Sequence, residues 1–290
     1  MWSWDWMRRA GLMERLTLIE GFALTLKGFF PLIVFGLFFL LDYGISWAEA
    51  PQLFVLYDNF PYDRRLTPGW GFSCLVKGVG QTVLFDTGAD GERLLRHMAV
   101  LRIDPREVDL VVISHLHGDH TGGLGAFLRA NPRVKVFLPG SSPEGFRQEI
   151  ERLGARVLAS KGSVEVCQGV WTTGELGGWI REQGLILEVP RGFVLITGCA
   201  HPGVLHMAKR VKELKGRVPF FVLGGFHLFA ADAEEIKPLA SALKALGVEF
   251  VGPCHCSGEE ARKIFRRVFG EGYVEMGVGR VLDLDELGGR

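Results

Sequence analysis

The most constraining feature of this sequence is a cluster of metal-binding side chains directly after a short apolar run. Residues 114–123 read Ser-His-Leu-His-Gly-Asp-His-Thr-Gly-Gly, which places three histidines and one aspartate within six positions. The preceding residues 109–113, Asp-Leu-Val-Val-Ile, predict a strand buried on both faces. Imidazole nitrogens and carboxylate oxygens bind zinc at about 2.0–2.2 Å. The pattern therefore predicts a metal site in the loop that follows a strand.

The spacing inside this motif predicts two separate points of attachment. His115 and His117 lie on one side of an extended segment, because side chains along a strand alternate with period two. Asp119 and His120 follow where the chain bends toward a helix, so we expect them to face a second point. The alternative interpretation is a histidine-rich loop that binds no metal.

Three more segments place polar side chains directly after apolar runs. Residues 82–88, Thr-Val-Leu-Phe-Asp-Thr-Gly, end a predicted strand at Asp86. Residues 197–203, Thr-Gly-Cys-Ala-His-Pro-Gly, contain His201, and residues 251–258, Val-Gly-Pro-Cys-His-Cys-Ser-Gly, contain His255. Since each follows a strand-like run, we expect these residues to lie near the histidine motif.

The motif His-x-His-x-Asp-His resembles that of the metallo-β-lactamase superfamily, and the similarity runs from about Leu53 to the C-terminus. The resemblance implies an α/β fold, the αββα sandwich of two mixed β-sheets flanked by helices, with the metal site at one edge. It implies one metal ion held by His115, His117 and His201, and a second held by Asp119, His120 and His255. Asp86 matches an aspartate that orients the metal-binding loop through hydrogen bonds without binding the metal.

One position departs from the superfamily pattern. Many members carry an aspartate that bridges the two ions, but residues 220–228 here read Phe-Phe-Val-Leu-Gly-Gly-Phe-His-Leu, with Gly225 in its place. The second ion is therefore expected to bind more weakly. His227 is interpreted as a ligand, as a group that faces the substrate and protonates the leaving group, or as a structural histidine. Cysteines beside the predicted site (Cys199, Cys254 and Cys256) are alternative ligands.

Several shorter motifs resemble one branch of the superfamily, which includes a dihydropterin-type synthase of methanopterin biosynthesis. These motifs are Asp58-Asn59, 71–73, 85–88, 198–201, 224–227 and 255–258. We expect a metal-dependent hydrolase that uses a metal-bound hydroxide, held by the histidines and Asp119, on an ester, lactone, amide or phosphoester. The alternative is a transferase that acts on a pyrophosphate-activated pterin. A lesser alternative is a non-hydrolytic metal-binding or redox module.

The alternation of strand-like and helical runs supports this fold class. Among the expected strands are the residues 82–85, 110–114, 194–197, 220–223 and 273–276, and among the expected helices are 92–100, 143–153, 204–214, 233–245 and 259–268. We expect residues 51–290 to form the catalytic domain.

The N-terminal 50 residues have a different composition. Residues 28–41 carry no charge, basic residues precede them, and the small-x-small sequence Ala-Glu-Ala stands at 48–50. This order is typical of a secretory signal peptide. Alternatively, residues 28–47 form a tilted membrane anchor, with Tyr43 and Trp47 at the interface, or an apolar helix packed on the domain or a partner. We therefore expect export or membrane anchoring, with a cytoplasmic location as the alternative.

Composition limits the partners. Lys+Arg and Asp+Glu are both 33, so no basic surface for nucleic acid is expected. The expected partner is a small-molecule substrate, in a cleft that Trp70, Trp171 and Trp179 are candidates to line. Zinc, as one or two ions, is the expected cofactor, although a His/Asp set also accepts manganese or iron. The sequence specifies no oligomeric state.

Overall fold

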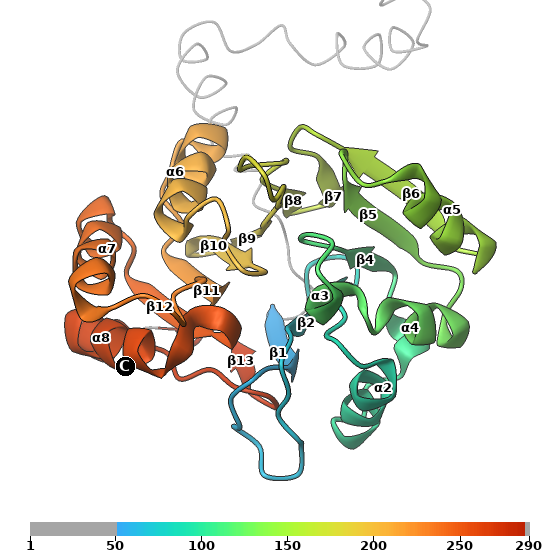
Figure 1. Cartoon of the computed structure of the whole chain (residues 1–290), viewed down its shortest axis with the longest axis horizontal. Coiled ribbons are helices and arrows are strands. Elements are labelled where there is room, and N and C mark those ends of the chain that lie inside the picture. Colours follow the sequence, from blue (N-terminus) through green and yellow to red (C-terminus); the bar gives the residue numbers. More distant parts are fainter. Residues whose placement is uncertain (1–50, 288–290) are drawn as a thin grey trace, which may run out of the picture. The chain divides into compact units, whose positions relative to one another are not determined.

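The computed structural model describes residues 51–287 and arranges their strands in two sheets (Figure 1). The first sheet has seven strands in the order β13-β1-β2-β3-β4-β5-β6. Its strands are β1 (Gln52–Tyr57), β2 (Ser73–Lys77), β3 (Val83–Phe85), β4 (Leu110–Val112), β5 (Lys135–Pro139), β6 (Arg156–Ser160) and β13 (Val281–Asp283). The expected signal peptide or anchor in residues 1–50 lies outside the described residues.

The second sheet has six strands in the order β12-β11-β10-β9-β8-β7. Its strands are β7 (Glu165–Cys167), β8 (Val170–Thr172), β9 (Leu185–Val189), β10 (Gly192–Thr197), β11 (Phe221–Gly225) and β12 (Phe250–Cys254). Strands β3 to β6 run parallel to one another, as do β10 to β12. The loops that follow parallel strands lie together at the carboxyl ends of those strands. Binding residues gather at this end in such sheets.

Helices cover the outer face of each sheet. Figure 1 shows α2, α4 and α5 on one side and α6, α7 and α8 on the other. The helices are α2 (Gly91–Val100), α3 (Gly118–Thr121), α4 (Leu124–Ala130), α5 (Glu144–Arg152), α6 (Val204–Lys215), α7 (Ala233–Leu246) and α8 (Gly258–Phe269). The predicted αββα sandwich is confirmed.

Alternation along the strands explains the layers. Val194 and Ile196 of β10 pack in the apolar cluster between the sheets, whereas Leu195 packs under α6, α7 and α8. On β2, Cys74 points between the sheets and Leu75 points to the opposite helix layer. Since side chains alternate across a strand, a sheet covered on both faces requires these continuous apolar runs.

The strand predicted at residues 273–276 is wrong. Tyr273 forms one isolated bridge with Val251, and Val278 then forms another with Pro61, so this segment crosses from one sheet to the other. Neither bridge extends into a ladder, and the chain turns at Gly279, where φ is +90°. The chain joins the first sheet afterwards, where β13 pairs antiparallel with β1.

The expected export or membrane anchoring is corrected as well. Across residues 51–287, no helix has the length and apolarity needed to cross a bilayer.

Candidate metal centre

The predicted ligands lie in loops at the carboxyl ends of strands from both sheets. The loop after β4 runs into the short helix α3 and carries four of them, and the loops after β10 and β12 carry one each. Their donor atoms form two groups: His115, His117 and His201 in one, and Asp119, His120 and His255, joined by Cys199, in the other. Within each group, all donor atoms lie within 4.8 Å of one another.

The first group consists of three imidazoles around one point. Nε2 of His115 lies 3.1 Å from Nδ1 of His117. The ring of His201 lies 4.6 Å from that of His115 and 5.0 Å from that of His117, centroid to centroid. His115 and His117 lie two residues apart, and His201 comes from a distant loop. The three rings converge, as the ligands of a three-histidine metal site do.

The second group places a carboxylate among donors of a different kind. Oδ2 of Asp119 lies 3.3 Å from Nε2 of His255 and 3.6 Å from Nε2 of His120. The sulfur of Cys199 lies 3.2 Å from the same nitrogen of His120 and 3.4 Å from that of His255. Asp119 and Cys199 therefore face the same pair of imidazole nitrogens.

Hydrogen bonds at Nδ1 leave Nε2 free on two buried histidines. Nδ1–H of His120 donates to Oδ2 of Asp86 at 2.7 Å, and Nδ1–H of His115 donates to Oγ of Ser114 at 2.9 Å. Oγ–H and N–H of Ser114 both donate to the Asp86 carboxylate, at 2.7 Å each. The loop is thus held by Asp86, and the lone pairs of both rings point into the site.

Burial sets the charge of these groups. It lowers the pKa of His115 and of His120 to about 3, so both rings are neutral, as metal ligation requires. It also raises the pKa of Asp86 to about 7, against the opposing effect of His115 and the Ser114 hydrogen bonds. A bound cation nearby would favour the ionised carboxylate.

Glu182 supports the loop after β10, although no sequence motif marks it. Its Oε1 accepts hydrogen bonds from the backbone N–H groups of Cys199 and Ala200, at 2.9 and 2.8 Å. Its Oε2 accepts from N–H and Nδ1–H of His201, at 2.9 and 2.8 Å. Glu182 is fully buried. Burial alone would raise its pKa, but the His201 hydrogen bond, His115 and the backbone donors lower it to about 2.

Asn59 holds the ring and the backbone of His255 in place through hydrogen bonds. Its Oδ1 accepts from Nδ1–H of His255 and from the backbone N–H of Gly71, each at 3.0 Å. Its Nδ2 donates to the backbone oxygen of His255 at 3.2 Å. The motif Asp58-Asn59 is visible in the sequence, which alone predicts no role for it. Asp58, fully buried, accepts from the backbone N–H groups of Phe60 and His255.

Backbone strain is concentrated at this site. Among the described residues, five non-glycine residues have positive φ, and four of them (Asp86, Ala200, His227 and His255) belong to these loops, with φ of 57°, 57°, 53° and 48°. Such conformations cost about 1–3 kcal/mol each and cluster at functional sites, where the surrounding contacts impose them.

His227 and one aromatic pair form the exposed side of the site. The ring of His227 lies 4.5 Å from that of His201, and its side chain is exposed. Trp70, half exposed, packs edge-on against His255 at 5.5 Å and against Phe229 at 5.7 Å. Of the three tryptophans predicted to line a cleft, Trp70 contacts the site, whereas Trp171 packs in the helix layer and Trp179 is fully exposed.

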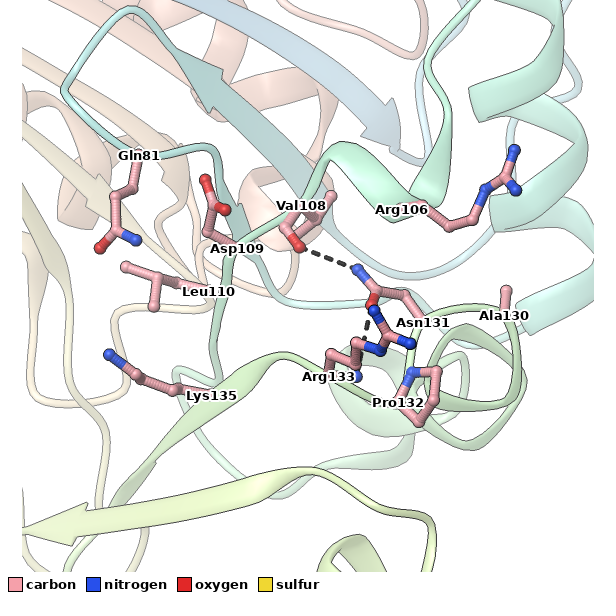
Figure 2. Close-up of a pocket in the computed structure, with 10 residues that line it drawn as sticks. All are labelled: Gln81, Arg106, Val108, Asp109, Leu110, Ala130, Asn131, Pro132, Arg133 and Lys135. Atoms are coloured by element: carbon pink, nitrogen blue, oxygen red, sulfur yellow. Dashed lines mark hydrogen bonds between the residues drawn. The ribbon is translucent and has the colours of Figure 1, made fainter.

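A surface hollow of about 660 Å³ lies away from these loops (Figure 2). It is lined at the amino ends of β4 and β5 by Gln81, Arg106, Val108, Asp109, Leu110, Ala130, Asn131, Pro132, Arg133 and Lys135. Figure 2 shows the side chain of Asn131 turned to the backbone oxygen of Val108, to which it donates at 2.8 Å. None of its lining residues belongs to the two donor groups.

The donor set fits a metal ion. Six imidazole or carboxylate donors converge in two groups, the buried rings of His115 and His120 are neutral, and hydrogen bonds from neighbouring loops orient the ligand rings. An αββα sandwich with such a centre defines a class of metal-dependent enzymes. Residues 66–255 match the family model described as the metallo-beta-lactamase superfamily, and the chain belongs to that superfamily.

Two relatives are similar over most of their length. One, from Methanocaldococcus jannaschii, is named 7,8-dihydropterin-6-methyl-4-(beta-D-ribofuranosyl)-aminobenzene-5'-phosphate synthase. It is 29% identical over 82% of this chain and 98% of its own length. A solved structure described as a metal-dependent hydrolase of the beta-lactamase superfamily is 27% identical, with a TM-score of 0.68, over 81% of this chain and 99% of that chain. Human tRNase Z, short form, at 16% identity and a TM-score of 0.55, shows the shared fold.

Proposed function

We propose that this chain is a metal-dependent hydrolase, with residues 51–290 as its catalytic domain and a small molecule rather than a nucleic acid as its substrate. The observation that carries the proposal is the pair of adjacent donor groups, built from His115, His117 and His201 and from Asp119, His120 and His255. Zinc is the proposed ion. A metal ion bound there lowers the pKa of water toward neutrality and polarises the bond under attack.

The side chains around the site divide the remaining tasks. Oδ2 of Asp119 faces Nε2 of His120 and Nε2 of His255 in the second group, where Asp119 orients the attacking water. His227 lies on the open side of the first group, next to His201, where it donates a proton to the leaving group. Asp86, Glu182 and Asn59 hold the ligand rings in place. The substrate is an ester, lactone, amide or phosphoester.

Hydrolysis by the full-length protein tests this proposal. Chromogenic esters, lactones, phosphomonoesters, phosphodiesters and a β-lactam are offered with zinc and manganese supplied separately. We expect turnover of one bond class that Asp119→Ala abolishes. Asp104→Ala, in a turn at the opposite end of β4, should leave the rate unchanged. Turnover that survives Asp119→Ala would show that another site is responsible.

The second candidate is a dihydropterin-type synthase, a transferase acting on a pyrophosphate-activated pterin. The full-length similarity to the enzyme of that name favours it. The exposed faces of Trp70 and Phe229, beside His255, are suited to stack on a flat heteroaromatic ring. The metal centre would then stabilise the departing diphosphate instead of activating water.

Pterin pyrophosphates distinguish the two candidates. A transferase consumes them only with an arylamine acceptor and releases diphosphate. We expect Trp70→Ala to raise KM for a pterin substrate while kcat changes little, since stacking binds ground and transition states alike. A metal-loaded protein that turns over the ester panel and ignores pterins would exclude the synthase.

A further inference from the structure

Cys199 is placed like the ligands of the second group, although the superfamily pattern assigns it no role. It lies two residues before His201, in the loop after β10, and is buried. Its sulfur faces Nε2 of His120 and Nε2 of His255, and these are the two nitrogens that Asp119 also faces. Four donors therefore surround one point.

Four of the six separations between these donors match the edges of a tetrahedron around a metal ion, and the other two are at most 4.8 Å. Zinc lies about 2.3 Å from sulfur and about 2.0–2.2 Å from nitrogen or oxygen, so neighbouring donors in a tetrahedral site are about 3.3–3.6 Å apart. The four edges that join Cys199 or Asp119 to His120 or His255 measure 3.2, 3.4, 3.6 and 3.3 Å. The loops hold these donors at coordination distances.

The space near Gly225 has no room for the bridging carboxylate of the superfamily pattern. A Cβ atom at Gly225 would lie 2.3 Å from the backbone oxygen of Gly198 and 2.7 Å from the sulfur of Cys256. It would also lie 3.1 Å from the ring of His255. No aspartate fits at Gly225, so a bridging carboxylate from β11 is sterically excluded.

We propose that the thiolate of Cys199 is the fourth ligand of the second metal ion, together with Asp119, His120 and His255. This assignment rests on the metal centre of the proposed function. When the ion binds, the thiol transfers its proton to solvent and the freed sulfur lone pair forms the metal bond, with no change in oxidation state. Because thiolate ligands favour zinc and disfavour manganese, the second position is selective for zinc.

Cys256 is the competing sulfur and provides a matched control. It donates to the backbone oxygen of Cys199 at 3.8 Å, and it belongs to a separate group with Cys199 and His227. In the metal-free protein, the hydrogen bond with Cys256 and burial raise the pKa of Cys199. A coordinated cation reverses this preference, because it deprotonates a thiol that binds it. Cys256 does not belong to the donor group of Asp119, His120, Cys199 and His255.

Cobalt substitution tests the assignment with the full-length protein, kept reduced and made metal-free. Two Co²⁺ ions per chain and a near-ultraviolet thiolate-to-cobalt charge-transfer band are expected in the wild type and in Cys256→Ser. In Cys199→Ser the band should disappear, and affinity for the second ion should fall at least about tenfold. A wild type that binds two ions without the band would overturn the assignment, as would a band lost in Cys256→Ser and kept in Cys199→Ser.

X-ray absorption of the zinc-loaded wild type needs no variant and therefore covers the case in which Cys199→Ser fails to fold. A sulfur neighbour at about 2.3 Å supports the assignment, and a shell of nitrogen and oxygen alone contradicts it. The outcomes also separate the two proposals. Sulfur ligation without hydrolysis of any substrate supports Cys199 and overturns the hydrolase. A folded chain that binds no metal overturns both.

Discussion

The histidines proposed as ligands are oriented in advance, because three of their rings each have one nitrogen already engaged in a hydrogen bond. Asp86 accepts from His120, Glu182 from His201 and Asn59 from His255. Each partner fixes a tautomer and a ring orientation, so little entropy is lost when a metal ion binds. The same partners absorb the strain of the left-handed backbone at Asp86 and His255.

Glu182→Gln should weaken the first metal position without removing any ligand. The glutamine amide retains one oxygen that can accept hydrogen bonds. Its NH2 group replaces the other carboxylate oxygen and faces backbone N–H groups, which lose their acceptor. We expect affinity for the first ion to fall about 10–100-fold and the free energy of unfolding to fall by about 1–3 kcal/mol. Calorimetric metal titration and urea unfolding measure the two effects.

Glu213→Gln is the matched control, since Glu213 lies on the exposed side of α6 and pairs with Arg210. It should change neither quantity. Unaltered metal affinity in Glu182→Gln would mean that the His201 ring is positioned by the loop backbone alone.

Gly225→Asp should fail to restore a bridging carboxylate and should instead destabilise the fold. The new Cβ would overlap the backbone oxygen of Gly198 and the sulfur of Cys256. Such overpacking costs about 1–3 kcal/mol, and more where the backbone must move. Thermal unfolding measures the loss. Gly162→Asp, on an exposed turn with no atom within 4 Å of the new Cβ, should unfold like the wild type. Tighter binding of a second ion in Gly225→Asp would contradict this explanation.

The helices and strands that the sequence predicted well are those marked by a pattern of apolar residues within the element itself. The run before His115 gave a strand and a ligand loop at once, and the helices α2, α5, α6, α7 and α8 follow clear apolar periodicity. Strand pairing is different. Residues 273–276 have strand-like composition, yet they form a crossing between sheets. The short hairpin β7–β8 carries too few residues to show a period of two.

The parts of the site that escaped prediction depend on contacts between distant residues. Glu182 lies 19 residues before His201, in a segment of glycines and short turns, and Asn59 lies 196 residues before its partner His255. No local pattern marks a carboxylate that binds backbone N–H groups of another loop. Cys199 and Cys256 were visible beside the histidines, but only the fold shows that Cys199 faces two of them.

The N-terminus of α7, a helix without catalytic residues, allows a test of how much a helix cap stabilises the fold. The carboxylate of Asp232 accepts from the N–H groups of Glu234 and Glu235, at 2.9 and 3.0 Å. Asp232→Ala should lower the free energy of unfolding by about 1 kcal/mol, because two helix donors lose their partner. Asp232→Asn keeps an acceptor and should retain most of the stability. Equal urea midpoints for the alanine variant and the wild type would show that α7 is held by packing alone.

The proposed metal centre takes its donors from both halves of the sandwich. The first group takes two histidines from the loop after β4 of the first sheet and one from the loop after β10 of the second. The second group likewise combines Asp119 and His120 with Cys199 and His255. A bound ion therefore crosslinks both sheets at their carboxyl edge, in addition to the apolar cluster between them.

Metal removal should accordingly lower the stability of the whole domain. A ligand that binds only the folded state adds about 4 kcal/mol when its free concentration is a thousandfold above Kd. For a domain of this size that corresponds to a rise in Tm of roughly 10 °C. Calorimetry of the full-length chain with zinc and with a chelator at the same pH measures the difference. Asp119→Ala should retain the contribution of the first ion and lose that of the second, so its shift should be smaller. Identical Tm values with zinc and with chelator in the wild type would mean that the ions do not join the two sheets.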